Sequence, residues 1–216
     1  EKTLLPISDK VLTAEARKDV SFDPFFMHIL AHELTHGLGP HEITVAGRKT
    51  TSRQELKELA GAIEEAKADV TGLFLLQYLM DGRVDAVPHG PDAERKLYTT
   101  YLASSFRTLR FGATEAHGRG MALQVNRFLE KGAFIVTAEG RFTVDVAKMK
   151  EAVKEIDRDL LTLEATGDYA GAKRLLDEKG VVPASFQNAL SSLGDVPTDI
   201  APDFAAARAL RAPAPR

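Results

Sequence analysis

The stretch from Ser52 to Gly82 does more than any other to restrict how this chain can fold. Its apolar residues recur three and four positions apart, at Leu59, Ile63, Ala66, Val70 and Leu73. That period belongs to one face of an α-helix packed against a core. Ser52 and Glu55 have the spacing of a capping box, which predicts where the helix begins. We therefore expect one long helix here.

Helical spacing also dominates the rest of the chain. The helix predicted over residues 23–39 begins with Asp23 as its N-cap and Pro24 at its first position. The other predicted helices are 92–111, 115–130, 146–164, 168–178 and 183–193. Two β-rich runs flank Glu139 and Gly140, which is the pattern of a hairpin. The expected fold class is mainly α with one small β-hairpin.

Composition excludes several classes of protein. The chain contains no cysteine, so disulfides and thiolate metal sites are ruled out, and a transition-metal site must use His, Asp and Glu. The net charge of −3, with acids and bases interspersed, argues against nucleic-acid or membrane-surface binding. The longest apolar run, Thr71–Met80, is about half of the ~20 residues that span a bilayer, which favours a buried helix segment.

The segment "HILAHELTHGLGPHE" holds four of the six histidines. His32, Glu33 and His36 spell His-Glu-x-x-His, and helical residues four apart lie one turn above each other. Two imidazoles so placed can reach one ion at Zn–N distances of about 2.0–2.1 Å. Glu33 is turned by roughly 100° from His32, beside the ion, where it can take a proton from water.

The simplest alternative is that these are ordinary surface or core residues. A chance His-Glu-x-x-His is expected on the order of once in a hundred chains of this size. The apolar neighbours Phe25, Phe26, Leu30, Leu34 and Leu38 predict a largely buried helix. Because buried histidines need partners, this context favours a metal site.

The acidic run "EEAKAD", residues 64–69, offers a third ligand from the neighbouring helix. We assign Glu65 as that ligand, with Glu64 as the alternative. Asp69, one turn on, is expected to accept a hydrogen bond from a ligand histidine and fix its tautomer. Gly72 on the same face lets the two helices approach closely. Lys67 is expected on a solvated charged face.

The remaining histidines receive different predictions. A rival pair of His28 and His32 would leave Glu33 and His36 without a role. His41 is expected in a loop or on the rim of the site, and His89 in a turn. His117 lies near a predicted helix start, among glycines that allow close backbone approach. On residue type alone, a structural role is the commoner one for such a histidine.

At this point the sequence resembles the dipeptidyl peptidase III family of zinc metallopeptidases. The likeness is carried, in order, by "HELTHGLG", "EEAKAD", "EAHGRGMALQVNRFLEKGAFIVT" and "LEATGDYAGAKRLLDEKGVV", within residues 23–195. Members release dipeptides from peptide N-termini, and their zinc lies in a mainly helical lobe that faces a second, β-rich lobe. The resemblance implies the helical zinc-binding lobe of a gluzincin-like metallopeptidase.

When the roles of the family's residues are transferred to the matching positions, the resemblance implies zinc ligands at His32, His36 and Glu65, and a general base at Glu33. Asp69 matches an outer-shell acid, and His117 a histidine that stabilises the transition state. The sequence departs from the family in two of these motifs. It has two residues between Glu33 and His36 where the family has three, so a regular helix suffices. The acidic motif ends in Asp69 where the family often has Glu.

The resulting hypothesis is amide hydrolysis by metal-activated water. The other expectations are a peptide substrate, a zinc lobe over residues 1–197, a partly mobile C-terminal extension over 198–216 and a further N-terminal lobe. A cytoplasmic location is expected, or a periplasmic one if a signal preceded Glu1. One alternative is a metal-binding lobe without peptidase activity of its own. A di-iron carboxylate site needs a second Glu-x-x-His, and the sequence has none.

Overall fold

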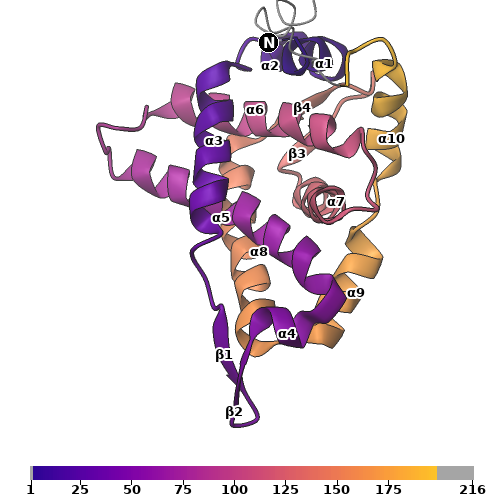
Figure 1. Cartoon of the computed structure of the whole chain (residues 1–216). Helices are drawn as coiled ribbons and strands as arrows, with labels where there is room; N and C mark the ends of the chain where they lie inside the picture. Colours follow the sequence, from indigo (N-terminus) through magenta and orange to yellow (C-terminus); the bar gives the residue numbers. More distant parts are fainter. Residues whose placement is uncertain (1, 199–216) are drawn as a thin grey trace, which may run out of the picture.

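The computed structural model describes residues 2–198, and most of them are helical (Figure 1). The elements in chain order are α1 (Leu4–Val11), α2 (Ala14–Arg17), α3 (Phe22–Thr35), β1 (Glu42–Val45), β2 (Arg48–Thr51), α4 (Ser52–Leu56), η1 (Lys57–Leu59), α5 (Ala60–Asp81), α6 (Pro91–Leu109), α7 (Ala116–Glu130), β3 (Phe134–Val136), β4 (Phe142–Val144), α8 (Val146–Thr166), α9 (Tyr169–Lys179), α10 (Ala184–Leu190) and η2 (Ser191–Leu193). The mainly α prediction is confirmed. The predicted C-terminal extension lies outside the described residues, apart from Thr198.

Helix α5 is the centre of the fold. It packs against α3, α7 and α8, and Figure 1 shows these helices gathered around it. The five apolar residues that predicted this helix are all buried: Leu59, Ile63, Ala66, Val70 and Leu73. The predicted helices after it correspond to α6, α7, α8, α9 and α10 with η2, within a few residues at each end. Helices α1 and α2 were not predicted.

The start of the long helix differs from the prediction. The side chain of Thr51, not Ser52, accepts the capping hydrogen bond, from the Gln54 N–H at 3.1 Å. The chain then breaks at Lys57, whose φ of 55° lies in the left-handed region and ends α4. A short 3₁₀ turn leads from there into α5. The predicted single helix is therefore α4, η1 and α5 in succession.

Helix α3 is also shorter than predicted. Ser21 occupies the N-cap position, and Asp23 lies inside the first turn, so the predicted N-cap at Asp23 is wrong. The helix ends at Thr35, but His36 keeps helical dihedral angles, and its N–H donates to the carbonyl oxygen of His32 at 3.2 Å. The turn that carries both histidines is therefore a regular α-helical turn, as expected from their spacing.

Two antiparallel hairpins accompany the helices, and the β3–β4 hairpin places Phe134 and Phe142 in the core. Strands β3 and β4 pair with Ile135 opposite Thr143, which confirms the hairpin predicted around Gly140. The second hairpin, β1 with β2, was missed, and it extends from the end of the molecule beyond α3 (Figure 1). Its turn is Ala46-Gly47, and both residues have positive φ.

Gly72 sets the distance between α5 and α3. A Cβ atom on Gly72 would lie 3.1 Å from the backbone nitrogen of His32, which is closer than ordinary van der Waals contact. We expect Gly72→Ala to lower the free energy of unfolding by about 1–3 kcal/mol, because it overpacks this contact. Chemical denaturation followed by circular dichroism measures the change.

Gly61→Ala is the matched control for that prediction. Gly61 also lies in α5, but its added Cβ would meet only the Cβ of Ala116, at an ordinary 3.4 Å. Replacing a helical glycine without a clash raises stability by about 0.5–1 kcal/mol. Equal effects of the two substitutions would mean that the close approach at Gly72 does not constrain the helices.

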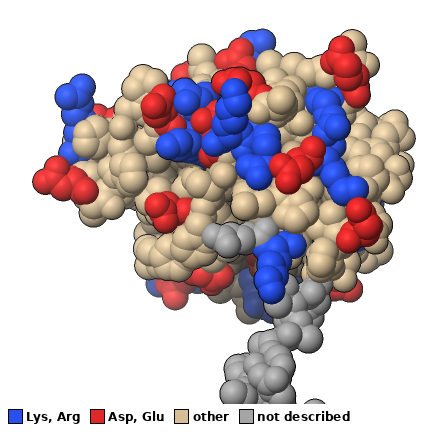
Figure 2. Space-filling model, turned by 90° about the horizontal axis from the view of Figure 1, so that it is seen from above, with Lys and Arg blue, Asp and Glu red and all other residues tan. Residues whose placement is uncertain are grey.

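The surface carries no segregated charge on the face seen from above. Figure 2 shows Lys and Arg side chains interspersed with Asp and Glu on that face, which agrees with the pattern in the sequence. Among residues 2–198, no helix combines the length and the apolar composition that a bilayer crossing requires. The apolar run Thr71–Met80 lies within α5, as predicted.

Candidate metal centre

The side chains of His32 and His36 meet at the C-terminal end of α3. Their Nε2 atoms lie 3.0 Å apart, and the two rings are nearly perpendicular, with an interplanar angle of 87°. The α-helical spacing of four residues produces this arrangement directly. Both Nε2 atoms therefore face the same small region.

Glu65, on α5, supplies a third donor atom to that region. Its Oε2 lies 3.4 Å from Nε2 of His32 and 3.8 Å from Nε2 of His36. Ligands at zinc distances in a tetrahedral site are separated by about 3.3 Å. The three donor atoms are thus spaced nearly as one tetrahedral ion requires, and they form a cluster that could hold a metal.

One carboxylate oxygen of Glu65 lacks a hydrogen-bond partner among the described residues. Its Oε2 is buried, and it accepts no hydrogen bond from the part of the chain that the structure describes. His117 Nε2 lies 3.1 Å away but is not aligned for a hydrogen bond. A buried carboxylate oxygen without a donor is costly. A bound cation would remove that cost, so these residues fit a metal ion.

Two further carboxylates orient the histidine rings from behind. Asp69 Oδ1 lies 2.9 Å from Nδ1 of His32, and Glu64 Oε1 lies 2.9 Å from Nδ1 of His36. With each Nδ1 paired to a carboxylate, each Nε2 is left to face Glu65. Such carboxylate–histidine pairs fix the ring orientation at metal sites.

These contacts shift the titration of His32 and Asp69. Burial lowers the pKa of His32, but the hydrogen bond to Asp69 and the nearby carboxylate of Glu65 outweigh it and raise that pKa to about 10. Burial raises the pKa of Asp69, yet the hydrogen bond to His32 and the charge of His28 bring it below its usual value. In the absence of an ion, His32 and Asp69 therefore form a charged pair.

Glu64 belongs to a second, buried cluster. Lys67 is fully buried, so its predicted place on a solvated face is wrong. Its Nζ donates to the carbonyl oxygens of Thr35 and Leu38 at 2.9 and 2.7 Å and lies 2.8 Å from Oε1 of Glu64. This ammonium occupies the C-terminus of α3, where the helix dipole favours positive charge.

Glu164, from α8, completes this cluster and was not predicted. Burial, together with the hydrogen bond to Glu64, raises the pKa of Glu164 to about 8. Burial raises the pKa of Glu64, but hydrogen bonds to Lys67 and His36 bring it below its usual value, so Glu64 ionises more readily than Glu164. Glu64 is therefore fully engaged away from the donor cluster, which distinguishes it from Glu65.

His117 lies at the start of α7, next to Glu65. Its side chain is 70% exposed, so it faces the open side of the cluster. Glycines bring it there: an added Cβ on Gly120 would lie 2.8 Å from the carbonyl oxygen of Ala62 in α5. The predicted close backbone approach is therefore present.

Glu33 lies on the outer side of α3, and its side chain is exposed. The apolar residues around it are exposed as well, with Phe26 at 53%, Leu30 at 49% and Leu34 at 60%. The predicted burial of this helix is therefore wrong on this side, because α5 covers only the opposite face. Glu33 thus lies in an exposed apolar strip, which we define as Phe22, Phe26, Ile29, Leu30 and Leu34.

The other histidines have separate places. His28 is buried, and its Nε2 lies 3.1 Å from the backbone oxygen of Asp69. It does not form a rival pair with His32. His41 is exposed in the loop before β1 and lines a polar hollow of about 550 Å³ beside His36. His89 lies in the loop before α6, as predicted.

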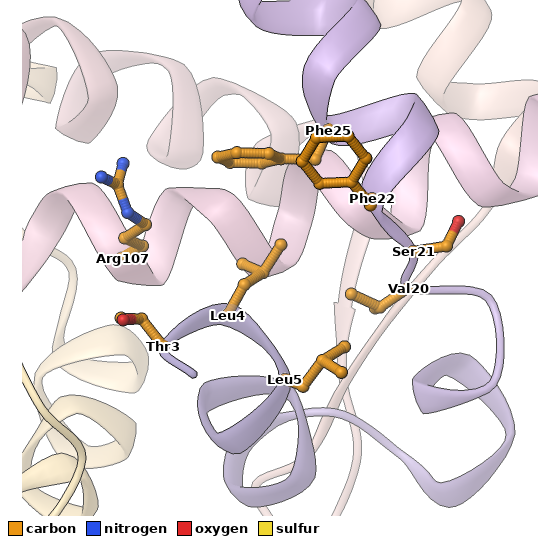
Figure 3. Close-up of a pocket in the computed structure, with 8 residues that line it drawn as sticks. All are labelled: Thr3, Leu4, Leu5, Val20, Ser21, Phe22, Phe25 and Arg107. Atoms are coloured by element: carbon orange, nitrogen blue, oxygen red, sulfur yellow. The ribbon is translucent and has the colours of Figure 1, made fainter. Parts of the chain in front are cut away.

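A second hollow, of about 420 Å³, lies at the other end of α3 (Figure 3). Leu4, Leu5 and Val20 line it together with Phe25, and Arg107 lies at its edge. Because it adjoins the N-terminus of the helix, whereas the histidines lie at the C-terminus, it does not belong to the donor cluster.

Fold and cluster together define a class: a mainly helical domain in which two helices bring two imidazoles and a carboxylate to one candidate metal centre. No family model matches the sequence. Solved structures match it closely. The chain is 51% identical to dipeptidyl-peptidase III from Corallococcus sp. strain EGB, with a TM-score of 0.90. The matched region covers 97% of this chain and 38% of that one. The enzyme from Caldithrix abyssi is 41% identical, with a TM-score of 0.91 and coverages of 97% and 39%.

Over the segment that it spans, the chain therefore belongs to the dipeptidyl peptidase III family. It is also 41% identical over 213 residues to "Nudix hydrolase 3" of Arabidopsis thaliana, covering 97% of this chain and 27% of the plant protein. All three relatives are hydrolases by name. The chain spans between about a quarter and two fifths of their lengths, so their names describe proteins much longer than the matched segment.

Proposed function

We propose that this chain is the zinc-binding lobe of a peptidase similar to dipeptidyl peptidase III. One observation carries the proposal: three donor atoms from α3 and α5 converge, and one of them, Glu65 Oε2, is buried without a hydrogen-bond partner among the described residues. The similarity to two named dipeptidyl-peptidases, with TM-scores of 0.90 and 0.91, supports the same reading.

In this proposal, His32, His36 and Glu65 hold the ion. When bound, zinc supplies a Lewis acid that polarises the scissile carbonyl and lowers the pKa of water. Asp69 keeps the Nδ1 proton of His32 in place, so that Nε2 remains available as a donor. Glu64 does the same for His36.

Glu33 acts as the general base. It follows the ligand His32 directly in the sequence and lies on the exposed side of α3, where a substrate has access. Its carboxylate takes a proton from the attacking water and passes it to the leaving amine. The exposed apolar strip around it offers a surface for peptide side chains.

His117 donates a hydrogen bond to the oxyanion that forms on the scissile carbonyl. The exposure of its side chain and its 3.1 Å separation from Glu65 place it beside the donor cluster without burying it. A donor in that position stabilises the charge that develops in the transition state. We therefore assign His117 a catalytic role.

A second candidate is a metal-binding lobe without peptidase activity on its own. Two observations favour it: the exposed apolar strip on α3, and the coverage of only 38–39% of the peptidase structures. Exposed apolar patches often mark contact surfaces. A further lobe of the same protein would cover such a strip and complete a peptide cleft.

The test combines metal analysis with peptide hydrolysis. We expect the purified chain to bind about one zinc ion, measured by elemental analysis. Release of dipeptides from peptide N-termini is then compared between this chain and a longer chain that spans the full length of its relatives. Zinc binding with activity only in the longer chain would support the second candidate for this segment. A chain that binds no divalent cation would overturn the proposal.

A further inference from the structure

A line of buried side chains reaches His32 from the far side of the core. It begins at Tyr101 on α6, whose hydroxyl donates to Oε1 of Gln124 on α7. Gln124 Nε2 donates to Oδ2 of Asp69 at 3.0 Å, and Oδ1 of Asp69 pairs with Nδ1 of His32 at 2.9 Å. Four helices therefore contribute one side chain each to a continuous line of hydrogen bonds.

The chemistry of the groups gives this line a direction. A carboxylate only accepts hydrogen bonds, so both groups that contact Asp69 must donate to it. Gln124 must then turn its NH₂ toward Asp69 and its oxygen toward Tyr101, which can donate a hydroxyl proton. At the other end, His32 must carry its proton on Nδ1. Its Nε2, which faces Glu65, then has a free lone pair that can bind a metal.

Burial and neighbouring contacts hold the line in place. Gln124 is fully buried and Tyr101 is 2% exposed. Gln124 Nε2 also donates to the carbonyl oxygen of Gly120 at 3.2 Å, which fixes its amide. His28 lies 3.1 Å from the backbone oxygen of Asp69, and its ring packs edge-on against Tyr101 with centroids 4.8 Å apart. Asp69 is thus fixed through both its side chain and its backbone.

We propose that Gln124 and Tyr101 are positioning residues that hold His32 in the tautomer and orientation needed to bind metal through Nε2. The inference rests on the proposed function, in which His32 is a ligand. Gln124 acts directly on Asp69, and Tyr101 acts one step further away by fixing the amide of Gln124. Neither residue touches the metal or the substrate.

The fold supplies a matched control for this line. Tyr98 on α6 donates to Oε1 of Gln77 on α5 at 2.9 Å, and both residues are buried. Gln77 Nε2 donates to Asp81 and Glu94, and neither of these acids is part of the candidate metal centre. The same tyrosine–glutamine pair therefore occurs twice in the core, and only one copy leads to His32.

The experiment measures the affinity of the full chain for Zn²⁺ by competition with a chromogenic chelator. Removing an outer partner of a metal ligand weakens binding about 10–100-fold. Gln124 lies one step behind such a partner, so we expect Gln124→Leu to weaken zinc binding by more than twofold and up to about tenfold, and Tyr101→Phe to weaken it less. Gln77→Leu and Tyr98→Phe lose the same kind of buried hydrogen bond and should leave zinc affinity within about twofold of the wild type.

A second readout is independent of bound metal. Nitrogen-15 NMR of the metal-free chain detects the Nδ1 proton of His32, which the hydrogen bond to Asp69 holds, and Gln124→Leu should speed the exchange of that proton with water because it loosens Asp69. Wild-type zinc affinity in Gln124→Leu, with an unchanged NMR pattern, would overturn the inference and leave the proposed function intact. Failure of the wild-type chain to bind Zn²⁺ would overturn the proposed function and, with it, this inference. If Gln124→Leu does not fold, Tyr101→Phe provides the same two measurements.

Discussion

Glu65→Gln is expected to weaken zinc binding by more than 100-fold. The substitution keeps the size of the side chain but replaces a charged oxygen donor by a neutral amide. The Oε2 atom that converges with His32 and His36 has no hydrogen-bond donor among the described residues, so in the proposed function its main role is to bind a cation. Loss of an outer partner costs about 10–100-fold in affinity, and loss of a direct ligand should cost more. Chelator competition at fixed pH measures the dissociation constant.

Glu64→Gln is the matched control, because it makes the same change one residue earlier. Glu64 contacts Nδ1 of His36 and the ammonium of Lys67, so it acts behind the ligand. We expect the smaller loss, about 10–100-fold. The reverse order, with Glu64→Gln as the more damaging change, would make Glu64 the ligand and contradict our assignment.

Local periodicity predicted the parts of the fold whose geometry is decided by residues close together in the sequence. The apolar spacing from Leu59 to Leu73 predicted a buried helix face, and that face is buried. The hairpin of β1 and β2 was missed because its turn is Ala46-Gly47, and Ala46 is not a residue that normally marks a turn with positive φ. The break at Lys57 was not predicted for the same reason, since a lysine rarely has a positive φ such as the 55° found there.

In the candidate site, too, some residues could be predicted from local spacing and others could not. The spacing of His32 and His36 predicted that their rings would meet, because helix geometry alone decides it. Residues whose role depends on packing between helices were not predicted. Lys67 looks like a surface lysine in the sequence, and it is buried only because the end of α3 lies over it. Glu164 and Gln124 come from distant helices, and no local pattern connects them to the site.

The exposure of α3 has a consequence for how activity must be measured. Its apolar strip would predict burial in a complete globular domain, yet Phe26 and Leu34 are more than half exposed. Glu33 lies in that strip, so the surface that we propose for the substrate is open in this segment. Kinetic tests of the catalytic residues therefore require the longer chain, whereas metal-binding tests need only this one.

Glu33→Gln is expected to lower kcat for dipeptide release about 10²–10⁴-fold in that longer chain, which is the usual contribution of a general base. The amide of glutamine has nearly the same shape as the carboxylate but cannot accept a proton from water. Glu33 lies outside the cluster formed by His32, His36 and Glu65, so zinc affinity should stay within about twofold of the wild type. Steady-state kinetics and chelator competition on the same preparation measure both quantities.

Glu42→Gln, at an exposed carboxylate in β1, controls for a general effect of removing one negative charge from the surface, and it should leave kcat unchanged. The two readouts for Glu33→Gln then separate the alternatives. Loss of zinc together with activity would make Glu33 a ligand, because a base outside the cluster has no effect on affinity. Retention of zinc with undiminished kcat would mean that another group accepts the proton. His117 would then be the first to test, because it is the exposed titratable side chain next to Glu65. Only retained zinc with lost turnover agrees with a carboxylate that moves a proton without holding the metal.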